Sequence, residues 1–404
     1  MTGLAPDVAY NPFEPGFTDD PYPAYAALRE HDPVHQSPFG IWLLFRYDDV
    51  RCLLRDTTLS VEDANAKPNA MSEMIREIAG DRADRGSYAM LNRDAPDHTR
   101  LRRLVSKVFT PRAVERLRPR IDALVHESLD QAAARGEMDV IADLAFPLPF
   151  TVISEMLGMP EVDHELLRTW SGLLVRTLEP INDPDVVRDI GEAGDAMRDL
   201  LTTVVAQKRQ APAGDLLSAL IAAEDDGDVL SDEELLDQVM LLYIAGHETT
   251  VNLIGNGMLA LLRNPEQLEG LRGDPSLVRA AVDELLRFDS PVQRTARITN
   301  AEVELGGKVL PKGAFVVAAI GAANRDPAHF ADPDRLDVAR ADNRHIAFGF
   351  GIHFCLGAPL ARVEGQIALQ SLLRRMPRLR LAGPEPEWRE SSTLRGLKAL
   401  PVAF

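Results

Sequence analysis

The feature that most restricts the fold is a long apolar run that begins after Ser231 and continues to Pro265. Ser231 and Glu234 have the spacing of a capping box, which starts a helix. The apolar residues of "LLDQVMLLYIAGHETTVNLIGNGMLALLRN" then recur with helical spacing until the proline. At 1.5 Å per residue, about 34 helical residues would span roughly 50 Å. We therefore expect one helix that crosses the whole molecule.

The remainder of the chain is predicted to be mainly helical. Apolar spacing predicts helices over most of the stretch from about residue 100 to about residue 275. Short β-rich runs separated by glycine and proline turns predict strands in two places, at about 35–55 and 298–322. In the first of these, "GIWLLFRYDDVRCLLRD" is typical of a strand that leads into a helix. No repeat or linker divides the sequence, so we expect a single domain over residues 1–404.

Composition excludes several classes of function. The 404 residues are 45% hydrophobic and 26% charged, with a formal net charge of −18. Such an acidic protein is not expected to bind nucleic acid or anionic membranes as its main function. No secretory signal and no membrane-spanning apolar run of about 18 residues is visible, so no membrane anchor is expected. The two cysteines, Cys52 and Cys355, suggest no disulfide framework, and we expect a cytoplasmic protein in which Cys52 is a buried packing residue.

Cys355 lies in the string "FGFGIHFCLG", residues 348–357. Gly349, Gly351 and Gly357 permit backbone angles that residues with a Cβ resist. A helix is predicted to follow, which would place the thiol near a helix N-terminus, where amide groups favour the thiolate. A buried cysteine in a glycine-rich turn would explain the same pattern if nothing else were present. The apolar residues that predict the helix are Leu356, Leu360, Val363 and Ile367.

A second motif, "AGHETT", occupies residues 245–250 in the middle of the long predicted helix. Gly246 weakens a helix interior, and the Thr249 hydroxyl can bond to a carbonyl of the preceding turn. Together they would loosen the helix where a small molecule could fit. A tolerated glycine beside a surface acid–threonine pair is the ordinary alternative.

Two further patterns place charged residues on one helix face. In "DELLRF", Glu284 and Arg287 are three residues apart, and in "DAPDHTRLRRLVSKVFTPR", His98 and Arg102 are four apart. Residues at these spacings are neighbours on a helix surface. Taken alone, both are also compatible with solvated helix faces.

Together these motifs resemble those of the cytochrome P450 family, in the family's order and over nearly the whole chain. The resemblance implies the P450 fold, a triangular prism that is mainly α with a minor β region. Haem b would lie between the long distal helix and the helix after the cysteine loop. Cys355 would be the axial thiolate ligand of the iron, and such a ligand favours O–O cleavage on the opposite face of the haem.

The resemblance assigns roles to the other motif residues. Phe348 would pack beside the sulfur, and Gly349, Gly357, Ala245 and Gly246 would also contact the haem. Glu248 and Thr249 would supply protons during oxygen activation. Glu284 and Arg287 would form a structural cluster with a third arginine, for which Arg335 fits best and Arg340 less well. The residues assigned to the haem propionates are His98, Arg102, Arg297 and His353.

The implied reaction is insertion of one atom of O₂ into a lipophilic small molecule, by hydroxylation or epoxidation. Electrons would come from NAD(P)H through a ferredoxin reductase and a ferredoxin of the 2Fe-2S or 3Fe-4S type, and the protein would act as a monomer. A basic docking patch would draw on Arg102, Arg103, Lys107, Arg112 and Arg362. A substrate such as a polyketide, terpenoid, steroid or other secondary metabolite would contact Leu241, Leu242, Ala245, Val292, Thr295 and Leu394. Arg176 and Glu179 are further candidates, for a polar group of the substrate.

Three alternatives remain open at this stage. A peroxide-driven peroxygenase of the same fold would have less need for the acid–alcohol pair. A haem sensor or electron carrier would have no use for a distal proton relay. A thiol enzyme with Cys355 as its nucleophile would need a base, and His353 is the only neighbour that could serve.

Overall fold

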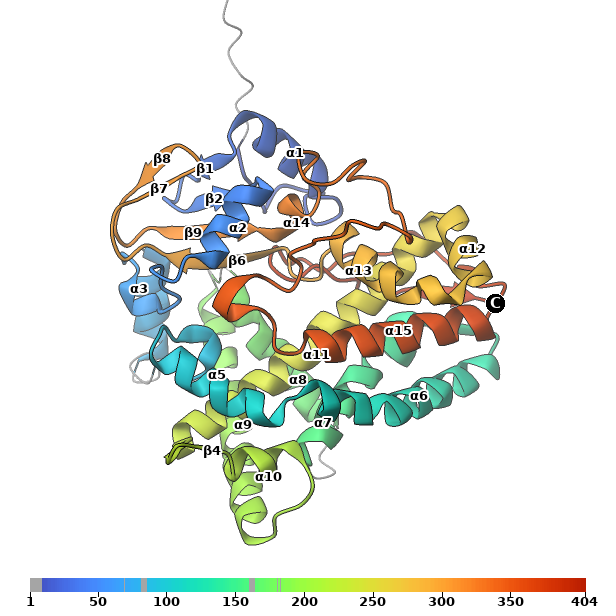
Figure 1. Ribbon diagram of the computed structural model, residues 1–404, viewed down its shortest axis with the longest axis horizontal. Helices are drawn as coiled ribbons and strands as arrows, with labels where there is room; N and C mark the ends of the chain where they lie inside the picture. The colour runs from blue at the N-terminus through green and yellow to red at the C-terminus, as the bar shows by residue number, and fades with distance from the viewer. Residues whose placement is uncertain (1–8, 69, 81–85, 160–163, 180, 182) are drawn as a thin grey trace, which may run out of the picture.

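The computed structural model describes all residues except 1–8, 69, 81–85, 160–163, 180 and 182 (Figure 1). Its longest helix, α11 (Asp232–Arg263), has 32 residues. The Ser231 hydroxyl accepts from the Glu234 amide and the Glu234 carboxylate accepts from the Ser231 amide, so the predicted capping box is present. Pro265 is the first residue of the next helix, α12 (Pro265–Gly273). The prediction of one molecule-crossing helix between Ser231 and Pro265 is confirmed.

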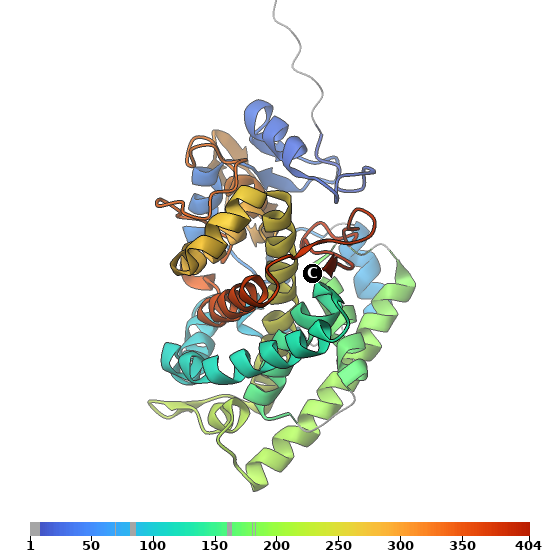
Figure 2. The same ribbon diagram turned by 90° about the vertical axis from the view of Figure 1, so that its right-hand side faces the viewer.

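The other helices are arranged around α11. In Figures 1 and 2 it passes between α15 (Ala358–Arg375) on one side and α9 (Pro184–Gln210) on the other. It also packs against α7 (Pro147–Leu157), α8 (His164–Val175) and α13 (Val278–Phe288). The remaining described helices are α1 (Tyr22–His31), α2 (Tyr47–Arg55), α3 (Ala70–Ala79), α5 (Asp97–Val108), α6 (Pro111–Ala133), α10 (Leu216–Ile221) and α14 (Ile320–Ala323).

A small sheet lies at one end of the helical body, at the upper left of Figure 1. Its strand order is β1 (Val34–Gln36), β2 (Trp42–Leu44), β9 (Phe315–Ala319), β6 (Arg294–Ile298). Strands β2 and β9 are parallel, and the other two pairings are antiparallel. The predicted class, mainly α with a minor β region, is confirmed. The smaller sheets contain β3 (Glu137–Asp139), β10 (Arg380–Leu381) and β11 (Pro401–Ala403), β4 (Glu224–Asp225) with β5 (Asp228–Val229), and β7 (Val303–Leu305) with β8 (Lys308–Leu310).

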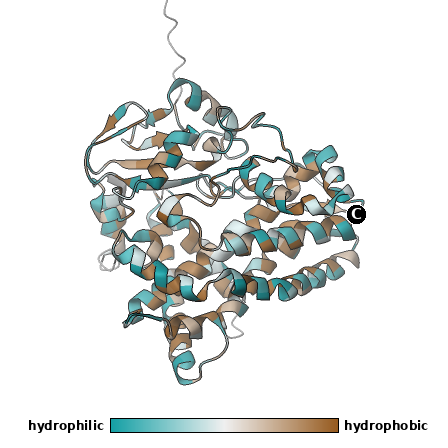
Figure 3. Cartoon of the chain, viewed as in Figure 1, coloured by the Kyte–Doolittle hydropathy of each residue, from teal (hydrophilic) through white to brown (hydrophobic). Residues whose placement is uncertain are grey.

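The hydrophobic core follows this arrangement. Every residue of α11 from Thr250 to Leu261 is buried, and the apolar side chains among them join a large cluster with α6, α7, α13 and α15. A second cluster lies under the sheet and includes Val34, Leu44 and Val316. Figure 3 shows hydrophobic residues along the strands and central helices, with hydrophilic residues interspersed on the outer helices. Among the described helices, none combines the length and the apolar character that crossing a bilayer would require.

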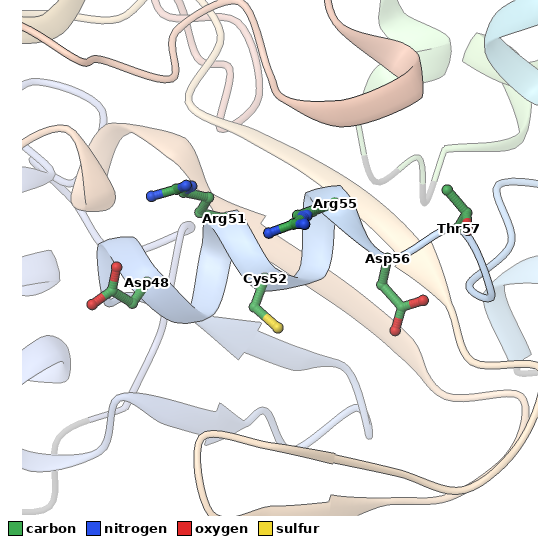
Figure 4. Close-up of a pocket in the computed structure, with 6 residues that line it drawn as sticks. All are labelled: Asp48, Arg51, Cys52, Arg55, Asp56 and Thr57. Atoms are coloured by element: carbon green, nitrogen blue, oxygen red, sulfur yellow. The ribbon is translucent and has the colours of Figure 1, made fainter.

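Two sequence predictions fail around α2. The predicted β region 35–55 is strand only as far as Leu44, because residues 47–55 form this helix. The more specific prediction, a strand that leads into a helix, is confirmed by β2 and α2. Cys52 is exposed and not buried, since α2 turns Tyr47, Val50, Leu53 and Leu54 into the core. Figure 4 shows Cys52 in a hollow formed by neighbouring residues of α2 and the following turn, Asp48, Arg51, Arg55, Asp56 and Thr57. This cysteine lies on the surface.

A buried ionic cluster holds α13 against the irregular segment before the cysteine loop. The Glu284 and Arg287 side chains are both fully buried, and their nitrogens and oxygens are 2.7 and 2.8 Å apart. The third member is Arg340, whose Nε donates to the Glu284 oxygens at 3.2 and 3.1 Å. The prediction of Arg335 is wrong. Its backbone carbonyl faces Arg287, while its side chain is 58% exposed and pairs with Asp337.

Substitutions of Arg340 and Arg335 should have different effects on stability. Arg340→Ala should lower the free energy of unfolding by about 3 kcal/mol, because it removes a buried partner of the Glu284 carboxylate. Arg335→Ala should change it by less than about 0.5 kcal/mol, because an exposed pair contributes little. Urea unfolding followed by circular dichroism measures both. Equal losses in the two variants would contradict the assignment of Arg340.

Candidate functional site

The cysteine loop has a backbone that requires glycine at two positions. Gly349 and Gly351 have φ angles of 72° and 74°, in the left-handed region. A Cβ at Gly351 would also lie 2.4 Å from the Leu54 carbonyl oxygen, so the loop packs closely on the end of α2. The loop then closes with a bond from the Cys355 amide to the Phe348 carbonyl, 2.9 Å long. Cys355 lies three residues before Ala358, the first residue of α15.

The Cys355 thiol lies in a recess that solvent can reach but that protein largely surrounds. Burial raises its pKa, while the amides of Gly357 and Ala358 and the guanidinium groups of Arg102 and Arg362 act in the opposite direction. Four groups that favour negative charge on the sulfur therefore surround it.

The Phe348 ring lies next to this recess. The Arg362 guanidinium stacks over it, 4.6 Å from the ring centroid. The ring thus fixes one of the cations that favour the thiolate.

The "AGHETT" motif lies in an unbroken stretch of α11. Ala245 is exposed although it is in the middle of the longest helix, and Thr249, one turn later, is half-buried. The Thr249 hydroxyl donates to the Ala245 carbonyl at 3.1 Å, as expected from the sequence. On the neighbouring face, Gly246 lets Ile153 approach to 3.4 Å of where a Cβ would be. The helix therefore leaves a space beside Ala245 and Thr249 while it remains packed on α7.

Glu248 has a partner that no sequence pattern indicated. Its carboxylate forms an ion pair with Arg389, whose side chain is 32% exposed, against 9% for that of Glu248. Arg389 follows the chain's last long helix and also donates to the Leu397 carbonyl at 3.2 Å. His247 is buried, and its ring contacts the Tyr243 carbonyl and the Ser171 hydroxyl at 3.0 and 3.3 Å. These contacts hold the His247 ring between α11 and α8.

The residues predicted to bind an anion converge beside the cysteine. The rings of His98 and His353 lie 4.2 Å apart, and both ring nitrogens of His98 are buried without a hydrogen-bond partner among the described residues. Arg297 is buried and donates to the adjacent Ala296 carbonyl, and Arg102 donates to the Phe354 carbonyl, both at 2.6 Å. No described carboxylate forms a salt bridge with any of these four side chains.

The pKa values in this cluster reflect first its burial and then, for His353, the neighbouring cations. Burial lowers the pKa of His353 to about 3, with further lowering from Arg297, His98 and Arg102. Burial lowers the pKa of Arg297 to about 10. Buried cations without anionic partners are costly, so the cluster is suited to a ligand that brings its own negative charges. Two haem propionates beside a thiolate ligand would fit this donor set.

Comparison with known proteins agrees with this geometry. Residues 28–381 match the sequence pattern of the cytochrome P450 family. The chain is a cytochrome P450. It is 45% identical to cytochrome P450 107B1 of Saccharopolyspora erythraea, over 99% of this chain and 98% of that protein. It is 43% identical to a vitamin D(3) 25-hydroxylase of Pseudonocardia autotrophica, over 97% and 96%. The structure superposes on myxobacterial cytochrome P450 CYP267B1 in complex with myristic acid with a TM-score of 0.90, at 42% identity over 97% and 98% of the two chains.

The basic patch expected on this P450 is partly neutralised. Arg103 and Lys107 both pair with Asp225 in β4, and Arg362 pairs with Asp283 at 2.8 Å. Arg112 is exposed. The predicted patch is therefore less positive than its residue count suggests.

The expected substrate residues come from three segments of the P450. Leu241 and Leu242 are partly buried on α11, and Thr295 is partly buried in β6. Val292 and Leu394 form a β-bridge that joins the chain before β6 to the C-terminal region. The Glu179 carboxylate accepts hydrogen bonds from this same C-terminal region.

A buried acid on α15 was missed by the sequence analysis, because its spacing resembles that of an ordinary helix charge. Burial raises the pKa of Glu364 to about 8, and the nearby Thr250 hydroxyl offsets this only in part. The folded protein therefore keeps this carboxyl protonated at neutral pH, whereas the unfolded chain ionises it above about pH 4.5.

This difference gives a pH-dependent prediction. Raising the pH from about 5.5 to about 8 should destabilise the wild type relative to Glu364→Gln by more than about 1.4 kcal/mol. The sign follows because the unfolded wild type has released the proton that the folded state retains. Urea unfolding at both pH values measures the difference. Glu192→Gln, an exposed change on α9, is the control and should show no such trend. A constant difference between Glu364→Gln and wild type would contradict the prediction.

Proposed function

We propose that this P450 inserts one oxygen atom from O₂ into a lipophilic small molecule, with electrons delivered by a ferredoxin and its NAD(P)H-dependent reductase. The observation that carries the proposal is the convergence of four cationic or donor side chains, without a described carboxylate partner, beside the recessed Cys355 thiol. Membership of the family supplies the reaction class.

The residues would hold the cofactor from two sides. Cys355 would ligate the iron, and His98, Arg102, Arg297 and His353 would bind the propionates. When bound, a thiolate-ligated haem supplies the O₂ chemistry that this protein's side chains cannot perform alone. Gly349 and Gly357 would let the loop lie against the cofactor, and Ala245 and Gly246 would leave room on the opposite side.

Thr249 and Glu248 would manage protons on the distal side. The Thr249 hydroxyl is half-buried on the side of α11 where Ala245 is exposed, and it could donate a proton on that side if it released the Ala245 carbonyl. Glu248 would take up protons from solvent and pass them to that hydroxyl, and its ion pair with Arg389 would fix the position of its carboxylate. A relay of one acid and one alcohol is sufficient for general acid catalysis in an otherwise apolar space.

The substrate class follows from the residues that would surround it. Leu241, Leu242, Val292 and Leu394 are apolar, and Thr295 adds one hydroxyl. A relative named as a vitamin D(3) 25-hydroxylase and a structural neighbour bound to myristic acid support a lipophilic substrate. We therefore propose a secondary metabolite of polyketide, terpenoid or steroid type.

The iron ligand is tested by spectroscopy. The reduced, carbon-monoxide-bound protein should show the strongly red-shifted Soret band of a thiolate ligand. Cys355→Ser should abolish that band, whereas Cys52→Ser, at the exposed cysteine, should leave it unchanged. A band typical of histidine-ligated haem in the wild type would contradict the assignment of Cys355.

The proton relay is tested by the fate of the electrons. With any substrate found by its spin-state shift, Thr249→Ala and Glu248→Gln should lower product formed per NAD(P)H by about tenfold or more and raise peroxide, because proton delivery fails. Thr249→Ser, which keeps the hydroxyl, should retain most of the yield. Unchanged yield in Thr249→Ala would refute the proposed role.

A further inference from the structure

The segment between α8 and α9 is tied to the C-terminal region through one carboxylate. A short 3₁₀ turn (Arg176–Leu178) follows α8, and Glu179 comes directly after it. We call residues 176–179 the cover segment, because the helices on either side of it, α8 and α9, both pack on α11. The Glu179 side chain is only 18% exposed, although it lies in a loop.

The groups around Glu179 form a carboxylate cradle in residues 389–394, which we call the C-terminal loop. Both carboxylate oxygens accept hydrogen bonds from backbone amides and from serine hydroxyls, and the Arg294 guanidinium lies 3.6 Å away. The Thr393 hydroxyl in turn donates to the Leu178 carbonyl at 2.9 Å. The donors to Glu179 are Ser391 Oγ at 2.5 Å, Ser392 N at 3.1 Å, Ser392 Oγ at 2.9 Å, Thr393 N at 2.9 Å and Leu394 N at 3.3 Å.

The same loop holds Glu248 at its other end. Arg389 forms the ion pair with Glu248, and its backbone carbonyl accepts from the Ser391 amide at 2.9 Å. Ser391, in turn, is one of the donors to Glu179. Residues 389–391 therefore connect the Glu179 carboxylate of the cover segment with the Glu248 carboxylate in the middle of α11, through Ser391 and Arg389.

We propose that the C-terminal loop is a latch that couples the cover segment to the proton relay, with Arg389 as a positioning residue for Glu248. When the cover segment is seated, Glu179 orders residues 391–394, and the ordered loop presents Arg389 to Glu248. When the cover segment lifts, the cradle loses its anion, the loop loosens and Glu248 loses its fixed partner. Arg389 would therefore hold Glu248 in place for proton transfer only while the cover segment is seated. This inference rests on the proposed role of Glu248.

The first test needs no substrate. Hydrogen–deuterium exchange of the resting haem-loaded protein is compared for Glu179→Gln, Arg389→Gln and wild type. Glu179→Gln should speed exchange of the Ser392, Thr393 and Leu394 amides by about tenfold, because they lose a charged acceptor. Arg389→Gln should speed exchange in residues 176–179 several-fold, although no hydrogen bond joins Arg389 to that segment.

Matched controls and a second variant make the result decisive. Glu192→Gln on α9 and Lys398→Gln, which removes an exposed pair with Glu387, should leave both segments unchanged. Glu248→Gln breaks the Arg389 pair from the side of α11 and should reproduce the Arg389→Gln pattern, so the test survives if one variant does not fold. Unchanged exchange of residues 176–179 in both variants would overturn the coupling.

A kinetic test separates the latch from the relay. In stopped-flow mixing, Glu179→Gln should bind and release 4-phenylimidazole several-fold faster than wild type, while Glu192→Gln should match wild type. During turnover, Glu179→Gln should also divert more electrons to peroxide, although it leaves Glu248 and Thr249 in place. If Glu248→Gln itself leaves the product yield unchanged, the relay has failed, and the exchange data still decide the latch. Wild-type ligand rates in Glu179→Gln would overturn the latch.

Discussion

The structure depends on a physical constraint on α11: the polar side chains of a helix buried at the centre of the molecule need partners from other segments. Most of those on α11 have one, and Asn252 is an exception, since both polar atoms of its side chain are buried without a partner among the described residues. An unpaired buried polar group costs far more than a hydrogen bond gains. Asp237 accepts from Arg198 of α9 and from the Tyr88 amide, and Gln238 bonds to the Met90 amide. Ser171 of α8 contacts His247. These partners belong to three segments, α9, α8 and the stretch from Tyr88 to Met90, so the hydrogen bonds also position those segments around α11.

The C-terminal region is positioned by the same rule. Glu248 pairs with Arg389, and the Asn256 amide donates to the Arg395 carbonyl at 2.9 Å. The Arg395 side chain in turn donates from its Nε to the Asp289 carboxylate at 2.7 Å. Two turns of α11 therefore hold a segment that has little regular structure of its own. The cluster proposed to bind the haem propionates is the converse case, because His98 and Arg297 have no salt bridge to a described carboxylate and would gain an anionic partner from the ligand. Binding of that ligand would stabilise the fold as well as complete the site.

Sequence reasoning succeeded where local pattern and tertiary role coincide. The capping box at Ser231, the glycine-bent loop around Cys355 and the i,i+4 pair of His98 and Arg102 are all visible in short windows. It failed where the partner is far away in the sequence and no local sequence pattern marks it. Arg389 meets Glu248 across 141 residues, and Arg340 meets Glu284 across 56. Neither arginine differs locally from an exposed one, as the wrong choice of Arg335 shows. The prediction for Cys52 failed for another reason: one position along a helix turns a side chain by about 100°, which takes Cys52 out of the buried stripe that Leu53 and Leu54 occupy.

The distance between Glu248 and Arg389 also has a consequence for how the protein is made. Protein synthesis at about 5–20 residues per second would separate their appearance by roughly 7–28 s. During that interval α11 carries a carboxylate that cannot be buried without its cation, so the helix cannot reach its final packing. The packing around Glu248 is therefore completed only after Arg389 has been synthesised.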